Sequence, residues 1–362
     1  MYANRPTLLA LIALLVIGTA PALGAPADDV EIRIGRDYAR RIELQYKVVT
    51  DPAVADRVAR IGQLVAQTTE RPTLPWSFKV IEFAEPNAVA LPGGFVYVTK
   101  PMLSFVRSDH ELAAVLAHEV AHTARRHQME MIRRSNQAIF WTLIIVAITG
   151  DPNLAAGAQL ISYGMLSGYT RDLEREADLL SIAYLARTPY TPVAALTLME
   201  RLLREERFRA TIDPGAFRDH PRTEERVAYI QTELRRRGIP IIRRTAANFL
   251  RISTQLVTDG GREIAELSVN ETPVVRLPDP ARIAGMAATL GQFFDGDPDP
   301  GHVTTIRLGD TWEIIGGGKV LLTIKSTDAA FFGVSAADAA TQIQSRLRWA
   351  IEQDRRKRQF NG

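Results

Sequence analysis

Five consecutive residues in the first half of the chain have the types and spacing of a zinc site. His118-Glu119-Val120-Ala121-His122 is an HExxH pattern. On a helix that turns by about 100° per residue, His118 and His122 lie about 40° apart, so both imidazoles can reach one ion. Glu119 lies beside that face and can contact a water at the metal without being a ligand. The pattern predicts Zn²⁺, with Glu119 as the general base that takes a proton from water and delivers it to a leaving amine.

Three residues compete for the place of third zinc ligand. His127 follows His118 by nine residues, which on one continuous helix rotates it to the opposite face, and Arg125 stands where the metzincin layout needs glycine. We therefore interpret His127 as a structural or surface histidine. Glu174 and Asp178 are four residues apart on one helix face, where one carboxylate could bind zinc and the other could orient a ligand histidine. This spacing favours Glu174 as the ligand and Asp178 as the supporting carboxylate.

His220 is the remaining candidate, and it directly precedes Pro221. A residue before proline is held in an extended conformation. Two interpretations stay open from residue chemistry alone. His220 could approach the metal or polarise a substrate carbonyl, or it could be an ordinary turn histidine.

The elements that must position these residues indicate an α+β fold. Helical spacing predicts helices over 28–46 and 52–68, and a period of two predicts a small sheet or hairpin between residues 76 and 99. A capping box formed by Ser108 and Glu111 begins a helix that we expect to run without a break from 109 to about 134. A further helix after Asp172 would carry Glu174 and Asp178.

The pattern changes after about residue 245. Residues 266–277 and 312–324 each predict a hairpin, followed by helices over 279–294 and 335–353. The two hairpin-helix halves resemble a weak internal duplication. They carry no catalytic constellation, so we expect a binding or packing domain. The predicted organisation is a mainly helical zinc peptidase domain over 25–245 and a smaller α/β accessory domain over 246–362.

Composition excludes several function classes. The 362 residues include 44 Lys+Arg and 41 Asp+Glu, a formal net charge of only +3, and the arginine pairs are scattered without interleaved aromatic residues. A nucleic-acid surface would concentrate basic residues on one face, so we expect no nucleic-acid partner. There is no cysteine, which rules out thiolate zinc sites, disulfides and a cysteine nucleophile.

Two apolar stretches bear on location. Residues 1–24 combine a basic start with an apolar run over 8–17 and small residues before Ala25, which predicts a signal peptide and a periplasmic mature protein. The alternative is an uncleaved anchor, although the run is short for a membrane span. Residues 138–149 are nearly all apolar, and they predict either a buried core helix or a segment that dips into a membrane or covers the site.

Ordered motifs over residues 30–235 resemble the HtpX-like and CaaX-prenyl-protease-like zinc metallopeptidases, and especially the periplasmic BepA-like branch. The motifs are Val48 to Pro52, Asn87 to Gly94, the HExxH helix ending in Arg126-His127, the Glu174 to Asp178 element, and His220-Pro221 with Arg226 beyond it.

The resemblance implies specific roles. Glu174 is expected to be the third zinc ligand and Asp178 its supporting carboxylate, while His220 is expected either to fill the fourth zinc position in a latent state or to turn toward substrate. The strand after Pro92-Gly93-Gly94 is expected to be an edge strand that pairs with substrate. Arg226 would support the His220 loop. Residues 246–362 lack the helical repeats of that branch.

These observations predict a gluzincin-like zinc endopeptidase that cleaves unfolded or misassembled envelope proteins, with a protein partner for the C-terminal domain and a membrane contact through 138–149. A metal-bearing, chaperone-like adaptor with a latent site is the alternative. A membrane-embedded protease ranks last, because the sequence lacks several long apolar spans.

Overall fold

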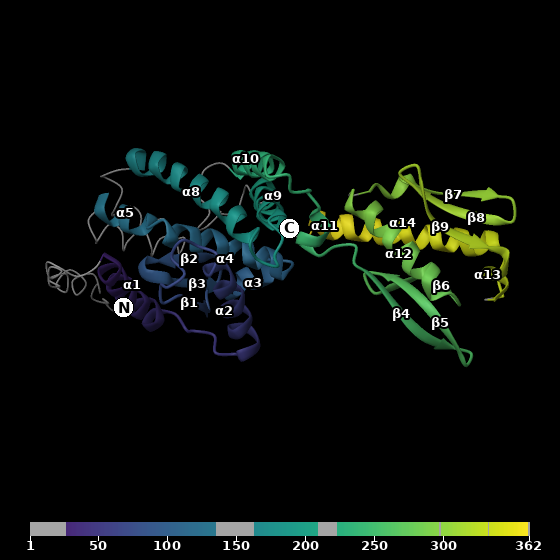
Figure 1. Ribbon diagram of the computed structural model, residues 1–362, viewed down its shortest axis with the longest axis horizontal. Coiled ribbons are helices and arrows are strands. Elements are labelled where there is room, and N and C mark those ends of the chain that lie inside the picture. The colour runs from purple at the N-terminus through teal and green to yellow at the C-terminus, as the bar shows by residue number, and fades with distance from the viewer. Residues whose placement is uncertain (1–26, 135–162, 209–222, 297, 332, 361–362) are drawn as a thin grey trace, which may run out of the picture.

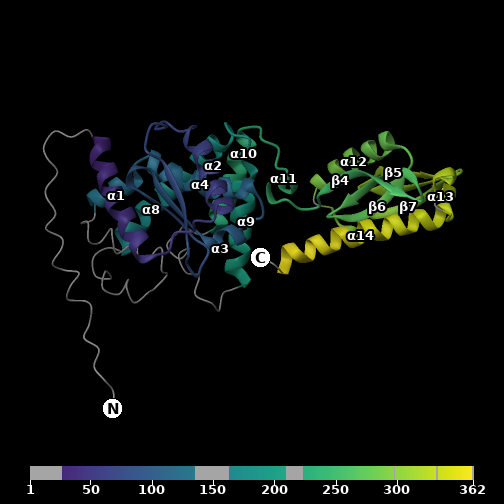
Figure 2. The same cartoon turned by 90° about the horizontal axis from the view of Figure 1, so that it is seen from below.

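The computed structural model describes residues 27–134, 163–208, 223–296, 298–331 and 333–360. The predicted signal peptide, the apolar stretch 138–149 and His220 lie outside the described residues. Figure 1 shows the elements up to α11 on one side and those from β4 onward on the other, and Figure 2 shows the same separation from a second direction.

The first part is mainly helical with one small sheet. Its elements in chain order are α1 (Ala27–Gln45), α2 (Pro52–Ala66), β1 (Ser77–Ile81), β2 (Ala88–Leu91), η2 (Pro92–Gly94), β3 (Phe95–Thr99), α3 (Lys100–Phe105), α4 (Asp109–Ala124), α5 (His127–Arg134), α8 (Tyr163–Leu185), α9 (Val193–Phe208), α10 (Thr223–Arg236) and α11 (Arg243–Ala247). The predicted helices over 28–46 and 52–68 are confirmed as α1 and α2. The helix expected after Asp172 is α8, which begins earlier, at Tyr163.

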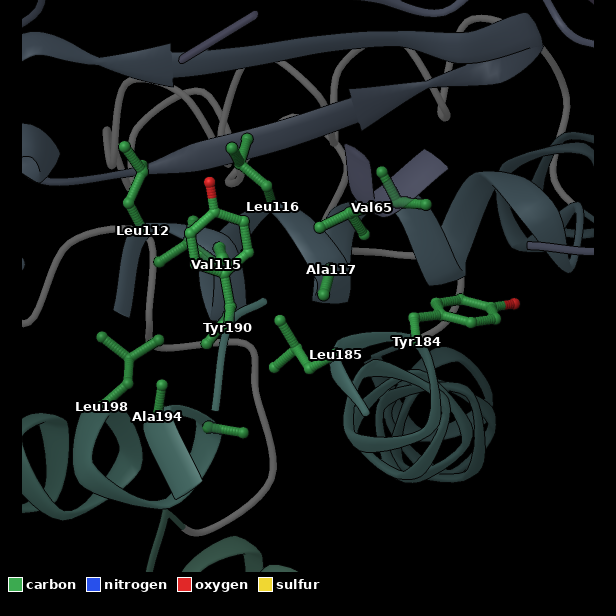
Figure 3. Packing of buried hydrophobic residues seen from close by; sticks show 14 of the residues in the cluster. Val65, Leu112, Val115, Leu116, Ala117, Tyr184, Leu185, Tyr190, Ala194 and Leu198 are labelled. Atoms are coloured by element: carbon green, nitrogen blue, oxygen red, sulfur yellow. The ribbon is translucent and has the colours of Figure 1, made fainter. Parts of the chain in front are cut away.

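Helix α4 is the centre of this part. Its leucines, valines and alanines are buried on nearly every side, as expected of a helix that other elements surround. Figure 3 shows Leu112, Val115 and Leu116 of α4 among side chains that include Val65, Leu185 and Leu198. Helix α4 contacts α2, α8, α9 and β2, so these elements pack around it on several sides.

The N-terminus of α4 is capped largely as predicted. The hydroxyl of Ser108 accepts a hydrogen bond from the Glu111 amide at 3.1 Å. The Glu111 carboxylate reaches the amide of Arg107 rather than that of Ser108, and it also pairs with buried Arg201 through two contacts of 2.6 Å. The fully buried Glu111 side chain therefore fixes the start of α4 against α9.

The predicted single helix over 109–134 is wrong. Helix α4 ends at Ala124, and α5 begins at His127 after Arg126 adopts a left-handed conformation with φ of 59°. Arg126 pairs there with Asp28 and Glu31 of α1. A left-handed backbone conformation is uncommon for residues other than glycine, so the helical periodicity of the sequence did not predict this break.

The small sheet has the order β1-β3-β2. β1 is parallel to β3, and β2 is antiparallel to it, with Ala88 opposite Val98. The strand after Pro92-Gly93-Gly94 is therefore central, and the expectation that it is the edge strand is wrong. The tight turn at Gly93, with φ of 75°, folds β2 back on one side of β3 while β1 occupies the other. The edge beside α4 is β2.

The second part contains two similar halves. The first is β4 (Ile252–Asp259), β5 (Arg262–Val269), β6 (Thr272–Leu277) and α12 (Pro280–Asp295); the second is η4 (Pro300–His302), β7 (Val303–Leu308), β8 (Thr311–Gly316), β9 (Lys319–Lys325), α13 (Ser326–Phe331) and α14 (Ala336–Phe360). Each half forms a three-stranded antiparallel sheet in chain order, where the sequence analysis expected two strands. The missed strands, β4 and β7, have mostly exposed side chains and so lack a clear apolar alternation.

Buried apolar residues form separate clusters in the two parts. One cluster includes Ile61, Leu116 and Leu196, and another includes Leu267, Leu290 and Leu347, with Ala246 in the first and Ala247 in the second. Both α12 and α14 contact strands of both C-terminal sheets, so the two halves share one core. Over the described residues, no helix is both apolar enough and long enough to span a bilayer.

Candidate metal centre

Helices α4 and α8 bring three side chains of the predicted zinc site together. The Nε2 atoms of His118 and His122 are 3.1 Å apart. Glu174 places Oε2 3.3 Å from Nε2 of His118 and Oε1 3.4 Å from Nε2 of His122. One helical turn separates the histidines, and α8 packs along α4, so the carboxylate faces both imidazoles. One potential ligand atom from each residue lies within 4.8 Å of the others.

These separations fit a zinc ion. Neighbouring ligand atoms in a tetrahedral site with zinc–ligand distances of about 2.0–2.1 Å lie about 3.3–3.4 Å apart. The two histidine nitrogens are 3.1 Å apart, and each lies 3.3–3.4 Å from a different oxygen of Glu174, so the carboxylate faces both nitrogens at about this spacing. Two imidazoles and one carboxylate leave the fourth tetrahedral position for water or substrate, which is the donor set of a catalytic zinc site.

Electrostatics at this point favour a positive charge. Burial alone would disfavour protonation of His118, but the nearby Glu174 and Asp178 carboxylates outweigh it and raise the pKa of His118 to about 10. The side chains of His118, His122 and Glu174 are only 14%, 15% and 8% exposed. A cation bound by them would be shielded from bulk water, so its attraction to the carboxylate is strong.

Asp178 supports His118, one helical turn beyond Glu174. Its Oδ1 lies 3.0 Å from Nδ1 of His118, on the side of the ring opposite the metal-facing nitrogen. Arg226 from α10 donates two hydrogen bonds of 2.8 Å to Asp178, and the Tyr229 hydroxyl donates a third. Burial would raise the pKa of Asp178, yet Arg226 and His118 hold it well below its usual range. Asp178 therefore stays ionised beside Nδ1 of His118.

Arg226 contacts two carboxylates of the candidate metal centre. Its guanidinium pairs with Asp178 and also lies 3.6 Å from Oε2 of Glu174, while the His220 loop that it was expected to support lies outside the described residues. One of these carboxylates belongs to a candidate ligand, and the other supports the candidate ligand His118. Tyr229, which the sequence analysis missed, joins the same network from one helical turn further on.

His127 is buried, but it does not lie on the face opposite His118, where one continuous helix would have placed it. The break after α4 turns its ring back, so that its Nδ1 lies 2.9 Å from Nδ1 of His122. Its Nε2 lies 3.4 Å from Oε2 of Glu176, which also pairs with Arg125 at 2.6 Å. Burial and the neighbouring His122 lower the pKa of His127 to about 4. No periodic signal marks this contact, because it depends on the left-handed residue Arg126.

A cavity opens beside the candidate ligands. Its polar lining includes His118, Glu119, Asp178 and Arg226, and Asn87 and Ala88 bring the start of β2 to it. Apart from Ser181, the remaining wall is apolar and is formed by Met102, Ala114, Val115, Ala195, Leu198, Met199 and Leu202. Glu119 is partly exposed.

Comparison with known proteins agrees with this geometry. The sequence model of peptidase family M48 matches residues 52–234, half of the chain. Mitochondrial metalloendopeptidase OMA1 of Schizosaccharomyces pombe is 30% identical over 177 residues, which cover 48% of this chain and 52% of that protein. OMA1 of Saccharomyces cerevisiae is 28% identical over 189 residues, covering 50% and 48%.

A bacterial relative shows a similar extent of likeness. The β-barrel assembly-enhancing protease of Escherichia coli is 27% identical over 245 residues, which cover 60% of this chain and 50% of that protein. The chain spans about half the length of the curated relatives it matches. The matched segment contains both α4 and α8, and hence every residue of the candidate metal centre. The resemblance to a metallopeptidase family is thus confirmed: the chain belongs to peptidase family M48.

Proposed function

We propose that this chain is a zinc-dependent endopeptidase whose metal ligands are His118, His122 and Glu174. The observation that carries the proposal is that one ligand atom from each of these residues lies within 4.8 Å of the others, inside the segment that matches the family. A zinc ion bound there would activate water and polarise the carbonyl of a peptide bond. Asp178 would hold His118 in the orientation that presents Nε2 to the ion.

Glu119 is proposed as the general base. It follows His118 on α4 and lines the same cavity, so its carboxylate is on the side where water and substrate would meet. It would accept a proton from the attacking water and deliver it to the leaving amine, a role worth about 10²–10⁴ in rate. His220 remains proposed as a group that fills the fourth position at rest or contacts substrate. It precedes α10 by three residues, a stretch of at most about 10 Å.

The edge of β2 is proposed to bind substrate as an added strand. Thr99 donates its amide hydrogen to the Asn87 carbonyl at 2.9 Å, which assigns Asn87, Val89 and Leu91 as the residues whose backbone groups face β3. The backbone groups of Ala88 and Ala90 point to the opposite side. There the Ala88 amide donates to Asn87 Oδ1 at 2.8 Å and the Ala90 carbonyl accepts from Gln128 at 3.2 Å, so a substrate strand would replace these two hydrogen bonds. Because Ala88 lines the same cavity as Glu119, an extended peptide paired with β2 would pass the candidate metal centre.

The cavity wall supports a preference for apolar substrate side chains. Val115, Leu198, Met199 and Leu202 offer no hydrogen bonds, so burying a charged side chain there would be costly. We infer that a residue next to the scissile bond is apolar. Apolar residues in extended conformation are accessible in unfolded chains and hidden in folded ones.

Unfolded or misassembled envelope proteins are therefore the proposed substrates. The predicted export signal and the likeness to a β-barrel assembly-enhancing protease support this location and role. Residues 25–245 are proposed as the peptidase domain and 246–362 as an accessory domain that engages a protein partner. The clusters of buried residues in the two parts support this division.

Glu119→Gln tests the enzyme. The wild type should bind one zinc per chain and cleave unfolded casein, whereas Glu119→Gln should bind zinc equally and lose at least about 100-fold in cleavage rate. Zinc can be counted by elemental analysis and cleavage followed with labelled casein. A zinc-loaded wild type that cleaves no unfolded protein would sink the proposal. Equal cleavage rates of the two proteins would show that Glu119 is not the general base.

A further inference from the structure

The two candidate histidine ligands have different supporting partners. Both present Nε2 to Glu174 and to each other, so in a zinc site each would bind through Nε2 and carry its ring hydrogen on Nδ1. His118 has the Asp178 carboxylate next to Nδ1. His122 has instead the ring of another histidine, His127, at 2.9 Å. The acceptor for the His122 hydrogen is therefore a neutral nitrogen rather than a carboxylate.

This arrangement allows one assignment of hydrogens. If His122 donates from Nδ1, then Nδ1 of His127 must carry the lone pair, which puts the hydrogen of His127 on Nε2. That Nε2 faces Oε2 of Glu176 at 3.4 Å, and a carboxylate is an acceptor. Building on the proposed zinc site, we propose that His127 is a positioning residue that orients His122 for zinc, and that Glu176 fixes the tautomer of His127.

The surrounding structure holds His127 in place. His127 is 3% exposed and starts α5, directly after left-handed Arg126. Arg126 pairs with Asp28 and with Glu31, whose side chain is fully buried. Arg71 donates to the Thr123 carbonyl at 3.0 Å and also pairs with Glu31, which ties the end of α4 to α1. The ion pairs and the hydrogen bond together fix the turn at Arg126, which directs the His127 ring toward His122.

The relay from His122 through His127 to Glu176 consists of two contacts, and these differ in strength. The His122–His127 separation of 2.9 Å is an ordinary hydrogen-bond length, whereas 3.4 Å between His127 and Glu176 is long. Glu176 is 38% exposed and shares its carboxylate with Arg125. Loss of His127 should therefore affect zinc more than loss of Glu176. Mutation of a residue that supports a ligand histidine typically lowers metal affinity by about 10–100-fold.

A pair of substitutions of equal size separates orientation from packing. Asn and Leu have nearly the same shape, but the Oδ1 atom of Asn can accept a hydrogen bond near the position of Nδ1. We expect His127→Leu to weaken zinc binding by about 10–100-fold and His127→Asn to retain most of the affinity. Packing alone predicts the reverse order, because Leu is the better buried residue.

The measurement is zinc affinity by competition of the full chain with a fluorescent chelator, with the melting temperature recorded for each variant. His110→Leu is the control: His110 lies on α4, and its Nδ1 accepts from the Thr191 amide at 3.2 Å, so one hydrogen bond is lost away from the candidate metal centre. We expect its zinc affinity to stay within about twofold of wild type. Glu176→Ala should weaken zinc by less than His127→Leu does.

Equal zinc affinity in His127→Leu and His127→Asn would overturn the relay, as would a control variant that loses as much affinity as His127→Leu. Should His127→Leu fail to fold, Glu176→Ala with unchanged zinc affinity and an unchanged absorption spectrum of bound Co²⁺ would overturn it. These results differ from failure of the zinc site itself, in which the wild type would not bind zinc at all.

Discussion

Buried charges have different arrangements in the two parts of the molecule. Around α4 and α8, Glu174, Asp178 and Arg226 converge with two histidines on one point beside a cavity. In the C-terminal part, two buried carboxylates instead pair with one arginine each. Glu266 pairs with Arg276, and Asp328 pairs with Arg282. Burial of a charge is therefore common to both parts, whereas convergence on a ligand-sized space marks the part with chemistry.

The largest contrast is expected between two buried carboxylates, Glu174 and Glu266. Mutation of a supporting residue typically weakens metal binding by about 10–100-fold. Glu174→Ala should weaken zinc binding by more than this, and casein cleavage should fall with it. Glu266→Ala should lower stability, because Gln255 and Arg276 lose their hydrogen bonds to the buried carboxylate, but zinc and cleavage should be unchanged. Elemental analysis, cleavage rates and thermal melting distinguish the two. Retained zinc in Glu174→Ala would remove it from the ligand set.

The next contrast is between two Arg–Asp pairs that are both bidentate. Arg226→Gln leaves buried Asp178 without its main partner, which typically costs about 3–5 kcal/mol of unfolding free energy. It should also weaken zinc by about 10–100-fold through His118. Arg282→Gln should cost less, because 25% of the Arg282 side chain is exposed and water can replace it, and should leave zinc unchanged. Denaturant unfolding and zinc titration measure both quantities. Equal zinc affinity in the two variants would mean that Arg226 serves the fold alone.

The smallest contrast concerns two buried methionines that are each 7% exposed, Met199 and Met286. Met199→Phe should narrow the cavity and reduce cleavage next to large apolar residues by about tenfold, with smaller residues favoured instead. Met286→Phe lies in the C-terminal core and should leave cleavage preference unchanged. Sequencing of peptides released from casein reports the preference. The same shift in cleavage preference in both variants would mean that the cavity does not determine specificity.

Sequence patterns predicted those features that depend on local spacing. The HExxH pair, the Glu174 to Asp178 spacing, the Ser108 cap and helices α1 and α2 all follow from one helical turn or one apolar stripe. In the C-terminal part, the strands with a buried face were found and the exposed ones were missed. The Gly260-Gly261 turn, whose φ values of 56° and 78° suit a two-residue hairpin, was a local signal that could have revealed β4.

Features that depend on distant parts of the chain were not predictable in this way. β3 is central because β1 and β2 both pair with it, although nothing within residues 95–99 distinguishes a central strand from an edge strand. Arg226 contacts Asp178 across 48 residues of sequence, and helical spacing carries no information over that distance.

The sequence by itself determined which side chains are available for chemistry: two histidines and three carboxylates, at spacings that a helix brings close together. Tertiary structure decided how that chemistry is supported. Ion pairs from α1 hold Arg126 in a left-handed conformation, α4 therefore stops, and His127 contacts His122 instead of facing away. Local propensity sets which residues share a helix face, but only long-range packing can hold one residue in a conformation that its own chemistry disfavours.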